Sequence, residues 1–297
     1  MGLSILIPVY NYPVTSLTEA LAQQLSASGS EGEIILLEDG SDLYVAGNRM
    51  LQQIPSVGYH QLEKNSGRAA ARQQLSQLAN FDNLLFLDCD SEIIKANFLS
   101  LYFDLVQKHT VLACGGRVYS ATPPADEQYM LHWKYGVKRE SNTNNSRAFM
   151  SNNFLIKKEL FDKLDHSILL QGYGHEDSWW GIQFEQLNIQ CITINNPVLH
   201  AALEKSGVFL AKSENALDNL LMLAKNADGD LISKHIKIFR WYRRLTKMGL
   251  AGVFVFFENP FHKYFRKNLL SKKPSLLFFD CYRLTILCQQ GKRKSIV

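Results

Sequence analysis

Short apolar runs alternate with longer amphipathic stretches along the first 120 residues of the chain. The apolar runs, each expected to form a β-strand, cover residues 5–9, 33–37, 58–62, 84–87 and 111–114. Stretches with helical periodicity fall between them, at residues 16–27, 68–79 and 97–108. Strands that alternate with helices at this spacing predict βαβ units. The expected fold class is therefore α/β, with a mostly parallel, Rossmann-like sheet flanked by helices.

The pattern changes after this region. Two prolines, scattered aromatics and a polar run predict a long excursion over residues 122–145, expected to cross the active face. Further elements are expected at 149–156 (strand), 157–164 (helix), after 172–177 (helix) and at 190–194 (strand). Beyond Gly207 the chain is predicted to contain helices only. We therefore expect a catalytic domain over residues 1–205 and a basic helical extension over residues 206–297.

The overall composition is that of a globular protein, but its charge is unevenly distributed. Hydrophobic residues make up 46% of the chain and charged residues 20%, which fits a substantial core. The formal net charge is +4. From Lys234 to the end there are 15 basic and two acidic residues, whereas the preceding part holds 17 basic and 26 acidic residues. An acidic body with a basic tail is informative about partners rather than about fold.

Cysteine usage and the absence of targeting patterns indicate the compartment. The five cysteines are odd in number and show no Cys-x-x-Cys pairing, and no signal peptide precedes the first strand. This favours a reducing environment with buried thiols, so we expect a cytoplasmic protein. No apolar run approaches the roughly 20 residues needed to cross a bilayer.

Two aspartates directly follow the buried apolar run at 84–87. Asp88 and Asp90, separated by one residue, can turn toward one point where the strand ends. In open α/β sheets this carboxyl edge is where ligands bind. Hard carboxylate oxygens suit Mg²⁺ or Mn²⁺, which complete their shells with water and phosphate. The alternative is that these acids only form a turn or cap a helix.

Four strand-end motifs occur in a fixed order along the chain. They are Ile7-Pro8-Val9-Tyr10-Asn11, Glu38-Asp39-Gly40-Ser41, Asn65 to Arg72, and Asp88-Cys89-Asp90. This series resembles the GT-A glycosyltransferases, in particular glycosyltransferase family 2, over about the first 200 residues. The later segment Gly172-Tyr173-Gly174-His175-Glu176-Asp177 resembles the Gly-Trp-Gly-Gly-Glu-Asp stretch of β-1,4-galactosyltransferase-like enzymes.

The resemblance implies a GT-A fold and a site for a UDP-sugar. Asp39 matches the family carboxylate that accepts the uracil N3–H, a hydrogen that cytosine lacks. Pro8, Tyr10 and Asn11 would form the other wall of the base pocket. The remaining residues implied to bind the nucleotide sugar are Asn65, Arg68, Arg72, Asp88, Gly116 and Arg117. Because Arg68 and Arg72 lie one helical turn apart they share a face, and one of them is implied to reach the nucleotide or its diphosphate.

The same resemblance implies a metal site and a catalytic base. Asp90 with Asp88 would hold Mn²⁺ or Mg²⁺, and His200, at the family's position beyond the last strand, would complete the shell. Asp177 matches the general base and Glu176 an acceptor-sugar ligand. The alternatives are a surface histidine, and ordinary acidic enrichment of a first helical turn. Tyr173 and His175 depart from the galactosyltransferase pattern, which leaves the donor and acceptor sugars open.

The basic tail interleaves Lys and Arg with aromatic and aliphatic residues. Such a segment is typical of a helix that lies on an anionic membrane surface. There are two alternatives. The tail could be a nucleic-acid-binding patch, although we do not expect nucleic acid as a partner, or a helical subdomain whose charges are solvated. Processive family members carry Gln-x-x-Arg-Trp and membrane spans, but here Arg240-Trp241 is preceded by Lys237 in place of Gln. We therefore expect a non-processive enzyme that adds one sugar. The resemblance implies inverting transfer to a saccharide or lipid-linked saccharide acceptor, in surface polysaccharide or glycolipid synthesis.

Two other classes of function also place an aspartate on a nucleotide-binding α/β sheet. A sugar-nucleotide pyrophosphorylase needs a Gly-rich basic loop after the first strand, and the residues after Val9 are no such loop. A non-catalytic nucleotide-sugar-binding protein would keep the pocket without the chemistry. The joint presence of Asp88, Asp90, Asp177 and His200 argues against this second alternative.

Overall fold

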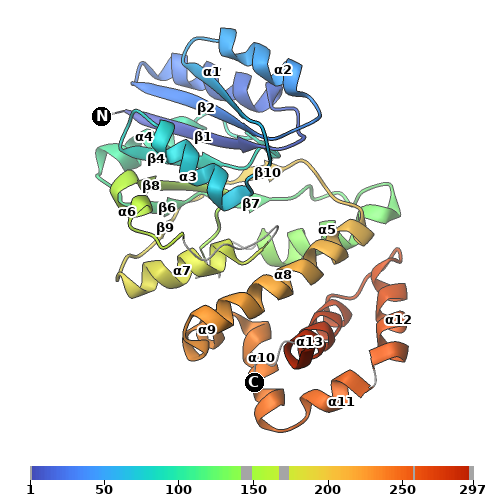
Figure 1. Cartoon of the computed structure of the whole chain (residues 1–297). Coiled ribbons are helices and arrows are strands. Elements are labelled where there is room, and N and C mark those ends of the chain that lie inside the picture. Colours follow the sequence, from blue (N-terminus) through green and yellow to red (C-terminus); the bar gives the residue numbers. More distant parts are fainter. Residues whose placement is uncertain (1, 142–148, 167–173, 257, 294–297) are drawn as a thin grey trace. The chain divides into compact units, whose positions relative to one another are not determined.

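The computed structural model describes residues 2–141, 149–166, 174–256 and 258–293 (Figure 1). The chain forms two compact units. The first, here the sheet unit, comprises Met1–Tyr119, Thr143–His166 and Gln183–Ala202. The second, the helical unit, comprises Ser120–Asn142, Ser167–Ile182 and Leu203–Val297. The predicted domains, 1–205 and 206–297, differ from these units because two internal segments belong to the helical unit, and their independence as domains stays a prediction.

The sheet unit is built on one seven-stranded sheet. Its strands, in spatial order, are β3 (Val57–Leu62), β2 (Gly32–Asp39), β1 (Leu3–Val9), β4 (Asn83–Leu87), β8 (Asn153–Lys157), β6 (Leu112–Cys114) and β9 (Ile192–Thr193). All neighbouring pairs are parallel except those of β8, which runs antiparallel to both β4 and β6. The prediction of a mostly parallel sheet is confirmed.

Helices pack against both faces of this sheet (Figure 1). On one face, α1 (Thr15–Ser28) and α4 (Phe98–Gln107) share a core with alternate strand residues such as Ile5 and Ile7. On the other, α3 (Arg68–Leu78) and α6 (Lys158–Asp162) pack together, and the α6 ring of Phe161 lies 4.9 Å from Phe86 of β4. Because helices cover both faces of the sheet, side chains on both sides of these strands are buried, and the strands therefore appear in the sequence as continuous apolar runs. The short helices α2 (Val45–Met50) and η1 (Leu51–Gln53) connect β2 to β3.

A second sheet of three short strands was not expected from the sequence. It consists of β5 (Ser91–Glu92), β10 (Val198–His200) and β7 (Arg117–Val118). In β10, His200 pairs with Ser91 of β5 and Val198 with Arg117 of β7. The Ala201 amide donates to the Asp90 carbonyl at 3.0 Å, which continues this pairing. The small sheet therefore brings His200 to the end of the Asp-x-Asp segment.

The helical unit contains helices and no strand among its described residues, as predicted for the chain beyond Gly207. Its later helices are α8 (Ser206–Asn226), α9 (Gly229–His235), α10 (Lys237–Lys247), α11 (Ala251–Phe256), α12 (Glu258–Leu269) and α13 (Leu276–Arg293). The helix α7 (Glu176–Gln186) begins in this unit. The described part of 122–145 contains helices that were not expected, namely η2 (Glu127–Tyr129), α5 (Met130–Tyr135) and the π-helix η3 (Gly136–Glu140). The expected path of this segment over the active face stays a prediction. Leu131 of α5 is fully buried, and the His132 ring stacks on Phe209 at 4.6 Å, so packing on α8 stabilises this helix.

The five cysteines are free thiols. Cys114 and Cys288 are buried as expected, whereas Cys89, Cys191 and Cys281 are partly exposed. Within the described ranges, no helix combines the length and apolar character needed to span a membrane.

Candidate donor site

Two of three adjacent parallel strands, β2 and β4, lead at their carboxyl ends into acidic residues of the predicted site. β1 pairs with both β2 and β4 in parallel, so all three end at the same edge of the sheet. Asp39 is the last residue of β2, and Asp88 follows β4 directly. The sheet therefore places these two buried carboxylates on one edge, where ligands of open α/β sheets bind.

The Asp39 carboxylate is enclosed by the loop that precedes α3. Its Oδ1 accepts hydrogen bonds from the Ser66 amide at 2.6 Å and from the Ser66 hydroxyl at 2.8 Å. Its Oδ2 accepts one from the Gly67 amide at 3.0 Å, and Asn65 donates to the Asp39 carbonyl at 3.1 Å. These bonds satisfy amides at the start of a helix, where the partial positive charge stabilises an anion.

Gly40 allows this loop to approach the end of β2. Its φ of +66° lies in the left-handed region, and a Cβ at this position would lie 2.3 Å from the Asn65 amide nitrogen. A larger residue would push the Lys64–Asn65 backbone away from Asp39. A glycine is therefore required at position 40 for the loop before α3 to reach the Asp39 carboxylate.

Asn11 ties the loop after β1 to the loop after β2. Its Oδ1 accepts hydrogen bonds from the amides of Asp42 and Leu43 at 2.9 and 3.0 Å, and its own amide donates to the Ser41 hydroxyl at 2.8 Å. Pro8 is partly buried at the end of β1, and the Tyr10 side chain is exposed. Tyr10 is thus accessible to a ligand, while Asn11 fixes the loop that carries it.

Sequence reasoning missed a buried carboxylate that supports these loops. Glu38 is fully buried and accepts hydrogen bonds from the Ser41 hydroxyl and from the Asn48 amide, the latter at 3.0 Å. Asn48 in turn accepts from the Val14 amide at 3.1 Å and donates to the Tyr12 carbonyl at 2.9 Å. In the sequence, Glu38 is visible only as a second acidic residue beside Asp39. The sequence alone does not show which of these two acids holds the loops in place.

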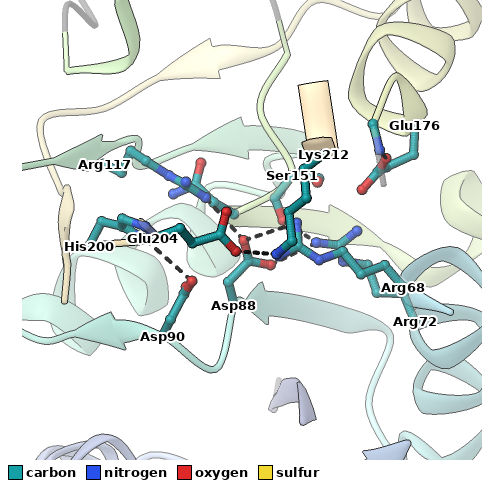
Figure 2. A network of polar contacts seen from close by, with 12 residues as sticks. Arg68, Arg72, Asp88, Asp90, Arg117, Ser151, Glu176, His200, Glu204 and Lys212 are labelled. Carbon is teal, nitrogen blue, oxygen red and sulfur yellow. Dashed lines mark hydrogen bonds and ion pairs between the residues drawn. The ribbon is translucent and has the colours of Figure 1, made fainter. Parts of the chain in front are cut away.

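Asp88 lies among three arginines, two from α3 and one from β7 (Figure 2). Its Oδ1 is 2.8 Å from Nη2 of Arg72, and its Oδ2 is 3.0 Å from Nη2 of Arg117 and 3.9 Å from Nη1 of Arg68. Arg72 also donates to the Ser151 carbonyl at 3.1 Å. The face shared by Arg68 and Arg72 is therefore directed at Asp88.

The three arginines differ in how much of each side chain meets solvent. The Arg72 side chain is 0% exposed, that of Arg117 13% and that of Arg68 40%. A fully buried guanidinium paired with a carboxylate holds structure together, whereas a half-exposed one can also contact a ligand. Of the two helical arginines, Arg68 is therefore better placed to reach a nucleotide, and Arg72 to position Asp88.

The Asp90 carboxylate is paired with a histidine rather than with an arginine. Its Oδ2 lies 3.4 Å from Nδ1 of His200 (Figure 2). Burial raises the pKa of Asp90, but the hydrogen bond and charge of His200, with the charges of Arg117 and Arg68, outweigh it and hold this pKa well below its usual range. Tyr119 packs against the His200 ring at 5.0 Å between centroids. Asp90 is thus held as a carboxylate beside an imidazole.

The Asp90–His200 pair has the donor set of a partial cation site. Among the described residues, the buried Asp90 Oδ1 accepts no hydrogen bond from protein. A carboxylate oxygen and an imidazole nitrogen are both ligands of Mn²⁺, and Mg²⁺ prefers the oxygen. The described part of the chain contains no group of three or more His, Cys, Asp or Glu that could hold a metal by itself. The pair therefore fits a cation that takes its other ligands from phosphate and water.

A buried amide network holds the glycines after β6. Asn153 accepts from the Tyr102 hydroxyl at 2.5 Å and donates to the carbonyls of Gly116 at 3.1 Å and Asn196 at 2.9 Å. A Cβ on Gly115 would lie 2.3 Å from the Tyr102 hydroxyl, so the chain passes closely here. Gly116, at φ +78°, directly precedes Arg117. Asn153 therefore positions the segment that delivers Arg117 to Asp88.

The predicted base segment belongs to the helical unit. Gly172 and Tyr173 lie outside the described residues, so the galactosyltransferase-like pattern stays a prediction. Glu176 is buried and its Oε2 accepts from the Gly174 amide at 3.2 Å, while Asp177 is partly buried in the first turn of α7. His175 adopts φ +71°, a backbone conformation that glycine adopts more readily than other residues. Burial, followed by the charge of Arg283, lowers the pKa of His175 to about 3.

The match to a family model identifies the class of protein as a glycosyltransferase. The chain belongs to the family described as "Glycosyl transferase family 2", and the model of this family matches residues 4–169. This favours a glycosyltransferase over a pyrophosphorylase. No curated protein matches the chain in sequence.

Solved structures show the same fold at low sequence identity. S. aureus TarS 1–349 is 15% identical with a TM-score of 0.52, covering 99% of this chain and 92% of that chain. Its complex with UDP-GlcNAc is 16% identical with a TM-score of 0.51 and the same coverage. The mannosyltransferase PcManGT from Pyrobaculum calidifontis, in complex with GDP-Man and Mn²⁺, is 14% identical with a TM-score of 0.51. The match covers 76% of this chain and 65% of the mannosyltransferase, so this chain spans less than two thirds of that protein. These likenesses show the GT-A fold.

Proposed function

We propose that this protein is a non-processive inverting glycosyltransferase that moves one sugar from a UDP-sugar to a saccharide acceptor. The observation that carries the proposal is the pairing of Asp90 with His200, 3.4 Å apart, beyond the strand end that holds Asp88. The TarS complexes with UDP and UDP-GlcNAc support a UDP-sugar donor. The acceptor we propose is a lipid-linked saccharide in surface polysaccharide or glycolipid synthesis.

Asp39 is the residue proposed to select uridine. Its Oδ2 accepts the Gly67 amide and has a second lone pair that can accept the uracil N3–H. The loop bonds keep this carboxylate from turning away, so a base that offers no hydrogen at this position would lack this hydrogen bond. Pro8, Tyr10 and Asn11 would line the other side of the base.

Mn²⁺ or Mg²⁺ is the proposed cofactor, held by Asp90 and His200, with Asp88 beside them. When bound, the cation would neutralise the negative charge that grows on the leaving diphosphate. The PcManGT complex with Mn²⁺ supports a divalent metal. Because both Asp88 oxygens already contact guanidinium groups, Asp90 and His200 carry the larger part of this assignment. Arg68, the most exposed of the three arginines, would bind the diphosphate, with Arg117, Asn65 and Gly116 at the donor.

Asp177 is proposed as the general base. It would take the proton of the acceptor hydroxyl while that oxygen forms a bond to the anomeric carbon. The bond to the diphosphate breaks, its electron pair leaves with UDP, and attack from the opposite side inverts the configuration. Glu176 would accept a hydrogen bond from the acceptor sugar. The partial exposure of Asp177, which leaves it accessible to an acceptor, supports this proposal.

A panel of nucleotide sugars, assayed for hydrolysis with Mn²⁺ or Mg²⁺, tests the donor site. We expect cleavage of a UDP-sugar that requires the metal, is lost on chelation and is lost in Asp90→Ala. Glu92→Ala, which removes an exposed carboxylate two residues after Asp90, is the matched control and should retain activity. If the intact protein cleaves no donor faster than Asp90→Ala does, the donor-site assignment fails.

A further inference from the structure

One face of α10 combines positive charge with exposed aromatic and aliphatic side chains. At 100° per residue, the positions three, four and seven residues apart share a face of a helix. The residues on this face are Lys237, Arg240, Trp241, Arg244, Lys247 and Met248. On the opposite face, Phe239 and Tyr242 are buried in the helical unit. Packing therefore fixes which side of α10 meets solvent.

The apolar part of this face continues into the following turn. Trp241 is 47% exposed, Met248 64% and Leu250 39%, and Val253 at the start of α11 is 47% exposed. Arg244 lies over the Trp241 ring, 5.2 Å from its centroid. Four large apolar side chains exposed within 13 residues are unusual on a soluble surface and indicate an apolar partner.

The charge around these side chains has one sign. From Lys234 to Lys247 there are six Lys or Arg residues and no Asp or Glu. Arg243 forms an ion pair with Asp230, and Arg240 donates to the carbonyls at the end of α9. Lys237, Arg244 and Lys247 are exposed. A partner that complements this face must offer negative charge together with apolar depth.

We propose that the α10 face docks on the surface of an anionic lipid bilayer. Trp241 and Met248 would enter the headgroup layer, where amphipathic side chains of interfacial helices lie, while Lys237, Arg244 and Lys247 would contact lipid phosphates. A single-stranded nucleic acid would use stacking aromatics, but Met248, Leu250 and Val253 offer no ring to stack on a base. The inference goes beyond the proposed sugar transfer and does not depend on the donor chemistry.

Tryptophan fluorescence reports directly on this docking. All four tryptophans lie in the described residues: Trp179 and Trp180 are buried, and the Trp133 indole donates to the Ser120 carbonyl at 2.8 Å. Trp241 is therefore the one expected to respond. Mixed phosphatidylglycerol–phosphatidylcholine vesicles should shift the emission of the full chain to shorter wavelength. Trp241→Phe should still co-sediment with the vesicles but show no shift.

Co-sedimentation of charge variants tests the electrostatic part. Each Lys or Arg near an anionic surface contributes about fivefold to binding, so Arg244→Gln/Lys247→Gln should bind about 30-fold more weakly. Lys108→Gln/Lys225→Gln removes the same charge from exposed positions elsewhere and should bind as the unaltered protein does. Calorimetric UDP affinity, measured on each variant, should not change.

Three results would overturn the docking inference. These are equal binding to pure phosphatidylcholine vesicles, equal weakening by both double variants, and a Trp241 shift produced by an oligonucleotide but not by vesicles. If the protein binds UDP with metal but does not bind vesicles, the docking inference is refuted and the proposed function stands. A protein that binds vesicles but no nucleotide would instead lose the proposed function.

Discussion

Replacing Arg72 by methionine separates the structural role of the arginine cluster from its role in binding. Methionine keeps a long, flexible, apolar chain in a position that is 0% exposed, so little volume is lost. The change removes the 2.8 Å ion pair to Asp88 and the hydrogen bond to the Ser151 carbonyl. In the unaltered protein the Asp88 side chain is 5% exposed, and its Oδ2 lies 3.0 Å from Nη2 of Arg117, which the change leaves in place.

The burial of the partners sets the size of the effect. Removing one member of a buried ion pair costs about 3–5 kcal/mol because a charge stays buried. Arg117 still contacts Asp88 after Arg72→Met, so we expect the lower end, about 3 kcal/mol. Asp88→Asn leaves the fully buried Arg72 guanidinium without its carboxylate partner. It should therefore lower the free energy of unfolding by the upper end of this range, about 5 kcal/mol. Arg68→Met affects a side chain that is 40% exposed and lies 3.9 Å from Asp88, and should cost less than about 1 kcal/mol.

Urea unfolding followed by far-ultraviolet circular dichroism, with UDP titrations on the same samples, measures both effects. The unfolding midpoint and its slope give the free energy of unfolding for each variant. Arg68→Met should weaken UDP binding while leaving the midpoint nearly unchanged, whereas Arg72→Met should lower the midpoint. If Arg68→Met and Arg72→Met destabilise the protein equally, burial does not separate their roles and the reasoning is refuted.

Three further predictions follow from single side chains. Gly40→Ala should destabilise the protein and weaken UDP binding, because its Cβ would lie 2.3 Å from the Asn65 amide nitrogen. Gly29→Ala, left-handed at φ +62° but in open space, is the control and should cost only about 1–2 kcal/mol in urea unfolding. Asp177→Asn should lower kcat for transfer to a saccharide by about 10²–10⁴-fold with UDP-sugar affinity unchanged in calorimetry; transfer at full rate would place the base elsewhere. Asn153→Ala should cost about 3 kcal/mol or more in urea unfolding, because its buried hydrogen-bond partners lose their bonds; a cost below about 1 kcal/mol would contradict this.

The main sheet could be predicted because burial on both faces leaves a direct trace in sequence. Residues 84–87 form an apolar run because β4 meets helices on both sides, and the structure buries all five residues of that strand. The same logic located β1, β2 and β6 to within about a residue or two at each end, the margin expected at element boundaries. Periodicity likewise located α1, α3 and α4.

The second sheet could not be predicted in the same way. β5, β7 and β10 are two or three residues long, too short for any periodicity to develop. Yet β10 determines where His200 lies, so the pairing of His200 with Asp90 came from family resemblance and not from pattern. The sequence also placed Arg68 and Arg72 on one face of a helix but did not show their depth. Depth depends on what packs over the helix, here the Ser151 backbone as well as Asp88.

Asp88 and Asp90 are separated by one residue, but they contact different kinds of side chain in the folded protein. Asp88 directly follows β4, where α3 and β7 bring guanidinium groups that contact both of its oxygens. Asp90 lies where the chain enters β5, beside β10, and there meets an imidazole, a partner that can itself bind a metal. A guanidinium cannot give up its proton, so Asp88 stays compensated whether or not a ligand is present. The carboxylate best able to exchange its protein partner for a cation is therefore Asp90. An Asp-x-Asp motif read from sequence treats the two positions alike, and the difference between them arises from the elements that pack around each.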